Sequence, residues 1–114
     1  IGGRYVITGQ ACIAPEYVFV HKSIFEKLRT MLGETVNRFY GNNPKENKDY
    51  SRIINEWHTN RLSELLKNHN GKVVVGGGEC DIKQRYVPPT VISYDSVSDM
   101  SKSCLAKEEI FGPI

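Results

Sequence analysis

The chain is 114 residues long, which suits one domain with a moderate hydrophobic core. Its formal net charge of +2 and its scattered lysines exclude the strongly basic surface that nucleic-acid-binding domains use. With 39% hydrophobic and 25% charged residues the composition is that of a folded globular chain, and no apolar run approaches the roughly 18 residues of a membrane span.

The three cysteines, Cys12, Cys80 and Cys104, are an odd number, and none has a Cys-x-x-Cys or histidine-paired spacing. We therefore expect neither a disulfide framework nor a metal site. Free thiols are typical of a reducing compartment, so a cytoplasmic location is expected, with membrane or organelle association left open.

The N-terminal segment predicts a turn that carries a cysteine, followed by a strand. Residues 1–8 are apolar, and taken alone they could equally be a frayed terminus or the end of a helix. Cys12 follows in a turn, ahead of Pro15. The β-branched and aromatic run at residues 17–20 then predicts a strand.

A long amphipathic helix is predicted over residues 23–40. Ser23 and Glu26 have the spacing of a capping box at its start, and Gly41 is expected to end it. Gly33 predicts a close packing partner, because glycine inside a helix costs about 1 kcal/mol relative to alanine. The apolar positions recur with a helical period and predict one buried face, made of Ile24, Phe25, Leu28, Met31, Leu32, Val36 and Phe39.

A second helix is predicted from Asn55 to about Asn68. Asparagine is a favoured N-cap, because its side-chain oxygen accepts a backbone N–H of the first turn. The side of this helix that is expected to be buried consists of Trp57, Leu62, Leu65 and Leu66.

Two strands are predicted at residues 72–75 and 87–94, with a glycine turn at residues 76–78. Pro88 and Pro89 cannot donate to a ladder and restrict where the second strand begins. The order strand, helix, helix, strand predicts an α/β fold with a largely parallel sheet.

Two motifs at opposite ends of the chain carry a family resemblance. The segment Gly9-Gln10-Ala11-Cys12 continues as Ile13-Ala14-Pro15, and Glu108-Glu109-Ile110-Phe111-Gly112-Pro113-Ile114 closes the chain. Phe39-Tyr40-Gly41 and Arg85-Tyr86-Val87 lie between them in the family's order. The sequence resembles the aldehyde dehydrogenase superfamily, and most closely its class 3 and fatty aldehyde dehydrogenase branch.

This resemblance implies that residues 1–114 are part of a catalytic domain with a Rossmann-like, three-layer α/β fold. The chain is then expected to be a piece of a polypeptide several times longer, with the coenzyme-binding domain outside it. The full protein is expected to be a homo-oligomer, either a dimer or a tetramer.

The activity that the resemblance implies is NAD(P)+-dependent oxidation of aldehydes to carboxylic acids. Cys12 is the expected nucleophile, which forms a thiohemiacetal and then a thioester that water hydrolyses. The class 3 resemblance suggests medium to long aliphatic aldehydes or aromatic ones. The choice between NAD and NADP is expected to be set outside the chain.

The C-terminal motif supplies two expected cofactor contacts. By resemblance, the Glu109 carboxylate accepts hydrogen bonds from the nicotinamide ribose hydroxyls, and the Phe111 ring packs beside the cofactor. An ionised carboxylate is acceptor-only and suits two hydroxyl donors. Glu108 is expected to be structural or solvated.

Plainer interpretations stand beside these. A lone cysteine is usually a small buried hydrophobe, which is what we expect of Cys80 and Cys104. Two alternative functions are considered: a catalytically silent interaction module, and a cysteine hydrolase that pairs Cys12 with a histidine. The histidines are His21, His58 and His69.

The chain departs from the family pattern in two respects. Ile7 stands where the family commonly carries asparagine. The oxyanion-hole asparagine, the glutamate base and the cofactor-binding glycine-rich turn have no counterpart in residues 1–114, and neither Glu16 nor Glu26 is assigned to the base role. The isolated segment is therefore expected to be inactive.

Overall fold

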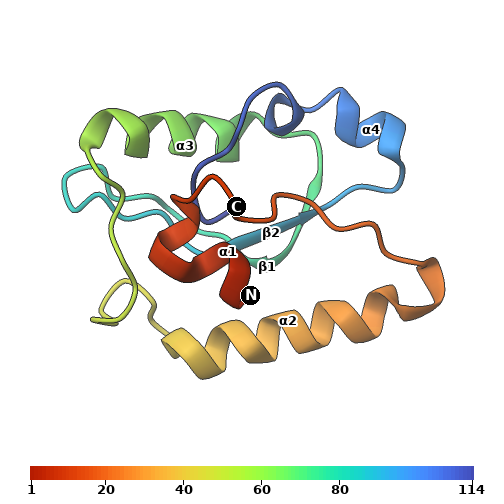
Figure 1. The fold of residues 1–114 in the computed structure, drawn as a ribbon, viewed down its shortest axis with the longest axis horizontal. Helices are drawn as coiled ribbons and strands as arrows, with labels where there is room; N and C mark the ends of the chain where they lie inside the picture. Colours follow the sequence, from red (N-terminus) through yellow and green to blue (C-terminus); the bar gives the residue numbers. More distant parts are fainter.

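The computed structural model describes residues 1–114 and shows an α/β arrangement in which a two-stranded sheet lies between two long helices (Figure 1). The helices are α1 (Gly2–Tyr5), α2 (Phe25–Tyr40), α3 (Glu56–Asn68) and α4 (Val97–Ser101), and the strands are β1 (Lys72–Gly76) and β2 (Thr90–Ser93). Short 3-10 turns cover Val6–Gly9, Lys22–Ile24 and Cys104–Ala106. No helix combines the length and the hydropathy that a bilayer crossing requires.

Strands β1 and β2 pair antiparallel, with Lys72 opposite Ser93. The predicted α/β class is confirmed, but the prediction of a largely parallel sheet is wrong for these two strands. Parallel neighbours need a crossover, usually through a helix. Residues 77–89, which connect the strands, contain no helix and fold back on themselves through a bridge between Asp81 and Tyr86.

The second strand is shorter than predicted, because it begins at Thr90 after two prolines that have no N–H to donate. Gly76 has a φ of +66°, and a Cβ atom there would lie 1.7 Å from the carbonyl oxygen of Pro89. Only glycine fits at this position, where the chain leaves β1.

Helix α2 forms as predicted, but its cap differs. The predicted capping box is wrong, because Ser23 lies in a 3-10 turn ahead of the helix and its N–H donates to Nδ1 of His21 at 3.3 Å. The prediction of a close partner for Gly33 is confirmed, since a Cβ atom there would lie 4.0 Å from the methyl carbons of Val75 on β1.

The predicted apolar face of α2 and the predicted strand at residues 17–20 are both largely exposed. On α2 only Val36 is buried, whereas Met31 and Phe39 keep 52% and 47% of their surface exposed. The predicted strand at residues 17–20 is wrong, because the run pairs with no other strand and Phe19 is 69% exposed. A β-branched run forms a strand only where a neighbouring strand accepts its hydrogen bonds.

Helix α3 confirms the predicted element and its cap, since Oδ1 of Asn55 accepts the N–H of His58 at 2.8 Å. Leu62 and Leu65 are buried as predicted, but Trp57 is 68% exposed. Trp57 precedes Leu62 by five positions, which places it about 140° away around a helix of 3.6 residues per turn.

One hydrophobic core joins α3 to the segment before β2 and to the C-terminal segment. Its buried members are Ile53, Leu62, Leu65, Val87, Ile110 and Ile114. Two of these belong to the C-terminal motif, so the motif's backbone is fixed to the core through the apolar side chains of Ile110 and Ile114.

A cluster of tyrosines ties the N-terminal segment to the same region. The rings of Tyr40 and Tyr50 meet edge to face, with centroids 4.9 Å apart. The Tyr50 hydroxyl donates to the Val87 carbonyl at 2.9 Å, and the Tyr5 hydroxyl donates to the Thr90 carbonyl at 3.1 Å. The tyrosines therefore anchor the start of the chain beside the strands.

Candidate active site

The candidate nucleophile lies at the surface. Cys12 occupies a turn in which the N–H of Ala14 donates to the carbonyl of Ala11 at 3.0 Å. The Cys12 side chain is exposed, and its backbone N–H makes no backbone hydrogen bond. Both the thiol and this N–H are therefore open to a small molecule.

The backbone just before the cysteine turn has an unusual conformation. Three consecutive residues have positive φ, namely Ile7 at 47°, Thr8 at 52° and Gly9 at 75°. Glycine adopts this left-handed region freely, whereas a β-branched residue there is strained. Ile7 thus occupies a position whose backbone suits asparagine better.

The side chain of Gln10 fixes this strained segment. Its Nε2 lies within hydrogen-bond distance of the Ile7 carbonyl, the Thr8 hydroxyl and the Arg52 carbonyl, at 3.1, 3.0 and 3.0 Å, and its two N–H groups are shared among these three acceptors. Its Oε1 accepts the N–H of Ile54 at 2.9 Å. Gln10 stands inside the cysteine motif, yet its partners at Arg52 and Ile54 could not be read from the sequence.

The C-terminal motif packs directly on the cysteine motif. A Cβ atom on Gly9 would lie 2.2 Å from the carbonyl oxygen of Gly112, so the two backbones approach as closely as only glycine permits. Glu109 is exposed, and Phe111 is half-buried with a φ of +52°. The structure therefore brings together the two loops that carry the three predicted site residues.

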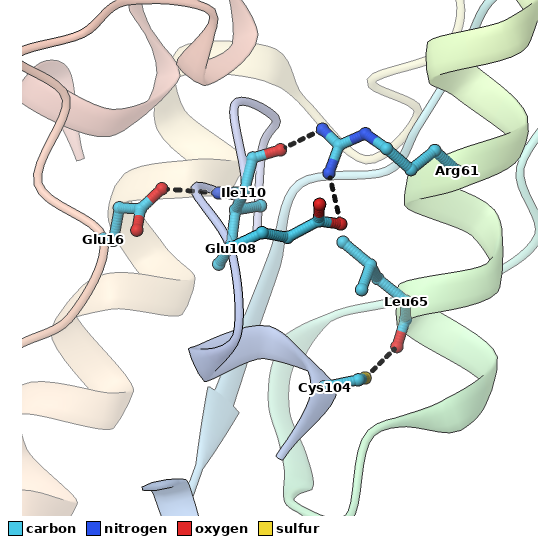
Figure 2. A network of polar contacts seen from close by, with 6 residues as sticks. All are labelled: Glu16, Arg61, Leu65, Cys104, Glu108 and Ile110. Carbon is cyan, nitrogen blue, oxygen red and sulfur yellow. Dashed lines mark hydrogen bonds and ion pairs between the residues drawn. The ribbon is translucent and has the colours of Figure 1, made fainter.

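The peptide groups of Ile110 are held from two sides, as Figure 2 shows. On one side an oxygen of Glu16 accepts the Ile110 N–H at 2.7 Å. On the other side Arg61 of α3 donates to the Ile110 carbonyl. The same guanidinium forms an ion pair with Glu108, with Nη1 and Oε1 3.2 Å apart. Glu108, expected to be structural or solvated, pairs with Arg61 while its side chain stays 54% exposed. The contacts of Glu16 and Arg61 with the C-terminal motif were not predicted from the sequence.

Arg4 brings positive charge to the same region. Its Nη1 lies 3.8 Å from Glu16, and its Nε donates to the Ile114 carbonyl at 3.0 Å. Burial lowers the pKa of the Arg4 guanidinium, while the charges of Glu16 and, more weakly, Glu109 raise it. The two carboxylates therefore stabilise the charged form of this buried arginine.

The other candidates lie outside this arrangement. None of the three histidines hydrogen-bonds to Cys12: His21 caps a 3-10 turn, His58 meets the Trp57 ring edge-on, and His69 ends α3. The hydrolase alternative consequently has no histidine in place.

The remaining cysteines pack against α3. Sγ of Cys104 donates to the Leu65 carbonyl at 3.6 Å, and burial raises the pKa of the Cys80 thiol. The structure contains no group of three or more histidine, cysteine or acidic side chains suited to a metal ion. A hollow of about 480 Å³ lies between α2 and β1, is lined by residues such as Gly33 and Val75, and includes neither Cys12 nor Glu109.

Comparison with known proteins places the chain in a class. The model of the aldehyde dehydrogenase family matches residues 1–114, so the chain belongs to that family. It is 44% identical over 112 residues to aldehyde dehydrogenase family 3 member A2 of Mus musculus, covering 98% of this chain and 22% of the relative. The resemblance to class 3 is thereby confirmed.

Solved structures agree with this assignment. The substrate-bound state of Staphylococcus aureus AldH superposes with a TM-score of 0.88 at 39% identity, covering 98% of this chain and 23% of that one. A mutant aldehyde dehydrogenase C of Pseudomonas syringae, in complex with NAD+ and octanal, gives a TM-score of 0.76 at 25% identity, covering 98% and 24%. The chain spans about a quarter of the length of the relatives it matches.

Proposed function

We propose that residues 1–114 are the nucleophile-bearing part of the catalytic domain of an NAD(P)+-dependent aldehyde dehydrogenase. The observation that carries this proposal is the contact of Gly9 with Gly112, which sets the Cys12 turn against the loop that carries Glu109 and Phe111. A reaction that needs a thiol beside a nicotinamide requires these two loops to be neighbours.

Cys12 acts as the nucleophile. Its thiolate adds to the carbonyl carbon of the aldehyde, the π electrons move to the oxygen, and the free backbone N–H of Cys12 donates to this oxyanion. Loss of hydride from the same carbon leaves a thioester. Water then adds to the thioester, and the carboxylic acid and the Cys12 thiol are released. The general base and a second oxyanion donor are supplied from outside residues 1–114.

The residues present suit one end of a dinucleotide. Glu109 is exposed and belongs to none of the ion pairs, so its oxygens are available to accept two ribose hydroxyls. Phe111 stands half-buried beside it and offers a ring face to the riboside. A bound NAD+ or NADP+ supplies the hydride acceptor. The chain has no glycine-rich phosphate loop, so it holds only the nicotinamide riboside.

The proposed substrates are medium to long aliphatic aldehydes or aromatic aldehydes. This class follows the similarity to family 3 member A2 and to the Pseudomonas syringae enzyme, whose structure holds octanal. We propose for the full protein a homo-oligomer, a dimer or a tetramer, and a cytoplasmic location, in which the exposed Cys12 thiol stays reduced.

Replacing the thiol in the natural full-length protein tests the proposal. Cys12→Ser is expected to lower NAD(P)+-dependent oxidation of octanal by about 10⁶-fold, as removal of the nucleophile does in a serine protease. Cys104→Ser, which changes a thiol packed against α3, is the matched control and keeps the activity. Undiminished oxidation by Cys12→Ser would overturn the assignment, and octanoate ester hydrolysis without nicotinamide cofactor would favour the hydrolase instead.

A further inference from the structure

The C-terminal loop has a buried anchor between two accessible functional side chains. Ile110 is 5% exposed and belongs to the core, while its neighbours Glu109 and Phe111 are exposed and half-buried. The positions of these two neighbours therefore depend on how the backbone of Ile110 is held.

Both peptide groups of Ile110 are bonded to charged side chains that approach from opposite sides (Figure 2). Glu16 accepts its N–H at 2.7 Å, and Arg61 donates to its carbonyl oxygen. The side chains of Glu16 and Arg61 are only 25% and 18% exposed, which limits screening by water. Hydrogen bonds to ionised groups are about twice as strong as neutral ones, so this pair fixes the peptide firmly.

Glu16 also belongs to the cysteine segment, because it follows Cys12 by four positions and is separated from Ile110 by 94. Arg4 lies 3.8 Å from Glu16 and donates to the Ile114 carbonyl, which makes a second tie between the two ends of the chain. A displacement of the cysteine turn therefore also displaces the loop of residues 109–111.

We propose that Glu16 is a positioning residue, which couples the Cys12 turn to the cofactor-contacting loop of residues 109–111. Arg61 holds the same loop from the opposite side, through the Ile110 carbonyl. The inference rests on the proposed roles of Cys12, Glu109 and Phe111. Through the Ile110 N–H, Glu16 sets the orientation of the Glu109 carboxylate and the Phe111 ring toward a nicotinamide riboside. It touches neither the aldehyde nor the reacting atoms.

The test compares Glu16→Ala with Glu16→Gln in the natural full-length protein. The dissociation constant of NAD+ or NADP+, whichever the wild type turns over, is measured by calorimetry alongside the KM for coenzyme and for octanal. Glu16→Ala is expected to raise the coenzyme Kd and KM about tenfold, as loss of one charge-assisted hydrogen bond does, with the octanal KM within twofold. Glu16→Gln keeps an acceptor oxygen for the Ile110 N–H and recovers most of this loss.

Glu26→Ala is the matched control, because Glu26 is exposed and its carboxylate pairs only with Arg29 within α2. It is expected to leave both coenzyme constants unchanged. An unchanged coenzyme Kd in Glu16→Ala overturns the inference, as does a Glu16→Gln variant no better than Glu16→Ala. If Glu16→Ala does not fold, Arg61→Lys decides the matter: a severalfold rise in its coenzyme Kd supports the inference, and a wild-type Kd overturns it.

The Cys12→Ser measurement separates this inference from the proposed function. If Cys12→Ser abolishes oxidation while Glu16→Ala binds coenzyme normally, only the positioning role fails. If Cys12→Ser retains oxidation, the proposed function fails and the positioning role fails with it.

Discussion

Oε1 of Gln10 accepts the backbone N–H of Ile54 at 2.9 Å, a contact that joins the cysteine turn to the segment just before α3. The two N–H groups at Nε2 of the same side chain are shared among three acceptors. One amide group thus holds two chain segments that are 44 positions apart.

Gln10→Ala is expected to lower the free energy of unfolding by about 2 kcal/mol, because it removes hydrogen bonds and leaves the partly buried Arg52 carbonyl without a donor. Gln10→Glu keeps the acceptor for Ile54 but loses the donors, so an intermediate loss is expected. Urea unfolding measures both. Gln84→Ala, which changes an exposed glutamine, is the control and is expected to stay within about 0.5 kcal/mol.

Ile7→Asn is expected to stabilise the fold. Ile7 has a φ of 47°, where a β-branched residue is strained and asparagine is tolerated, so a gain of about 0.5–1 kcal/mol is expected. The change in melting temperature on thermal unfolding measures this gain. The control is Ile13→Asn, the same substitution at a residue that is 94% exposed and does not have a positive φ. A lower melting temperature for Ile7→Asn than for the wild type would contradict the explanation by backbone strain.

Gly9→Ala is expected to be severely destabilising, by about 3 kcal/mol or more, because the added methyl would meet the Gly112 carbonyl at 2.2 Å and φ is +75°. Gly2→Ala is the matched control, since a Cβ atom there has no neighbour within 4 Å and lies in a helix. Gly2→Ala is expected to leave the free energy of unfolding unchanged or to raise it by up to about 1 kcal/mol. Equal melting temperatures for the two variants would show that the cysteine and C-terminal motifs do not pack as described.

The buried hydroxyl of Tyr50 is expected to make the folded state less stable at high pH. Burial raises the pKa of Tyr50 above its ordinary value, so above about pH 10 the unfolded chain loses this proton while the folded chain keeps it. Stability should then fall by up to about 1.4 kcal/mol per pH unit for this group.

Urea unfolding between pH 9 and 11 checks this expectation, with the pH range set by the ordinary tyrosine pKa of about 10. Tyr50→Phe is expected to flatten the decline, although it costs stability at neutral pH by removing the hydrogen bond to Val87. Tyr17→Phe, at a ring 63% exposed, is expected to leave the slope unchanged. A Tyr50→Phe slope equal to that of the wild type would contradict the assignment.

The sequence predicted elements whose signals are local. The Asn55 cap and the buried Leu62 of α3 follow from spacing within one helix, and the close neighbour of Gly33 follows from the cost of helical glycine. The end motifs were also recognisable, because Cys12 and Glu109 stand in short strings whose residue order is distinctive.

What depends on distant partners could not be predicted in this way. Residues 17–20 have strand-like composition, but no second strand lies beside them. Glu16 and Arg61 meet at Ile110 only after folding, and no local pattern distinguishes them from other surface charges. The sheet direction likewise depends on how the connection of residues 77–89 folds.

The tie between Arg4 and Ile114, 110 positions apart, bears on the order in which the protein is made and folds. Ribosomes add about 5–20 residues per second, so the cysteine turn emerges several seconds before Gly112 exists to pack on Gly9. Closing so long a loop is slow compared with forming α2 or α3, whose contacts are local. The cysteine turn is therefore made early and acquires its contacts with the C-terminal segment late.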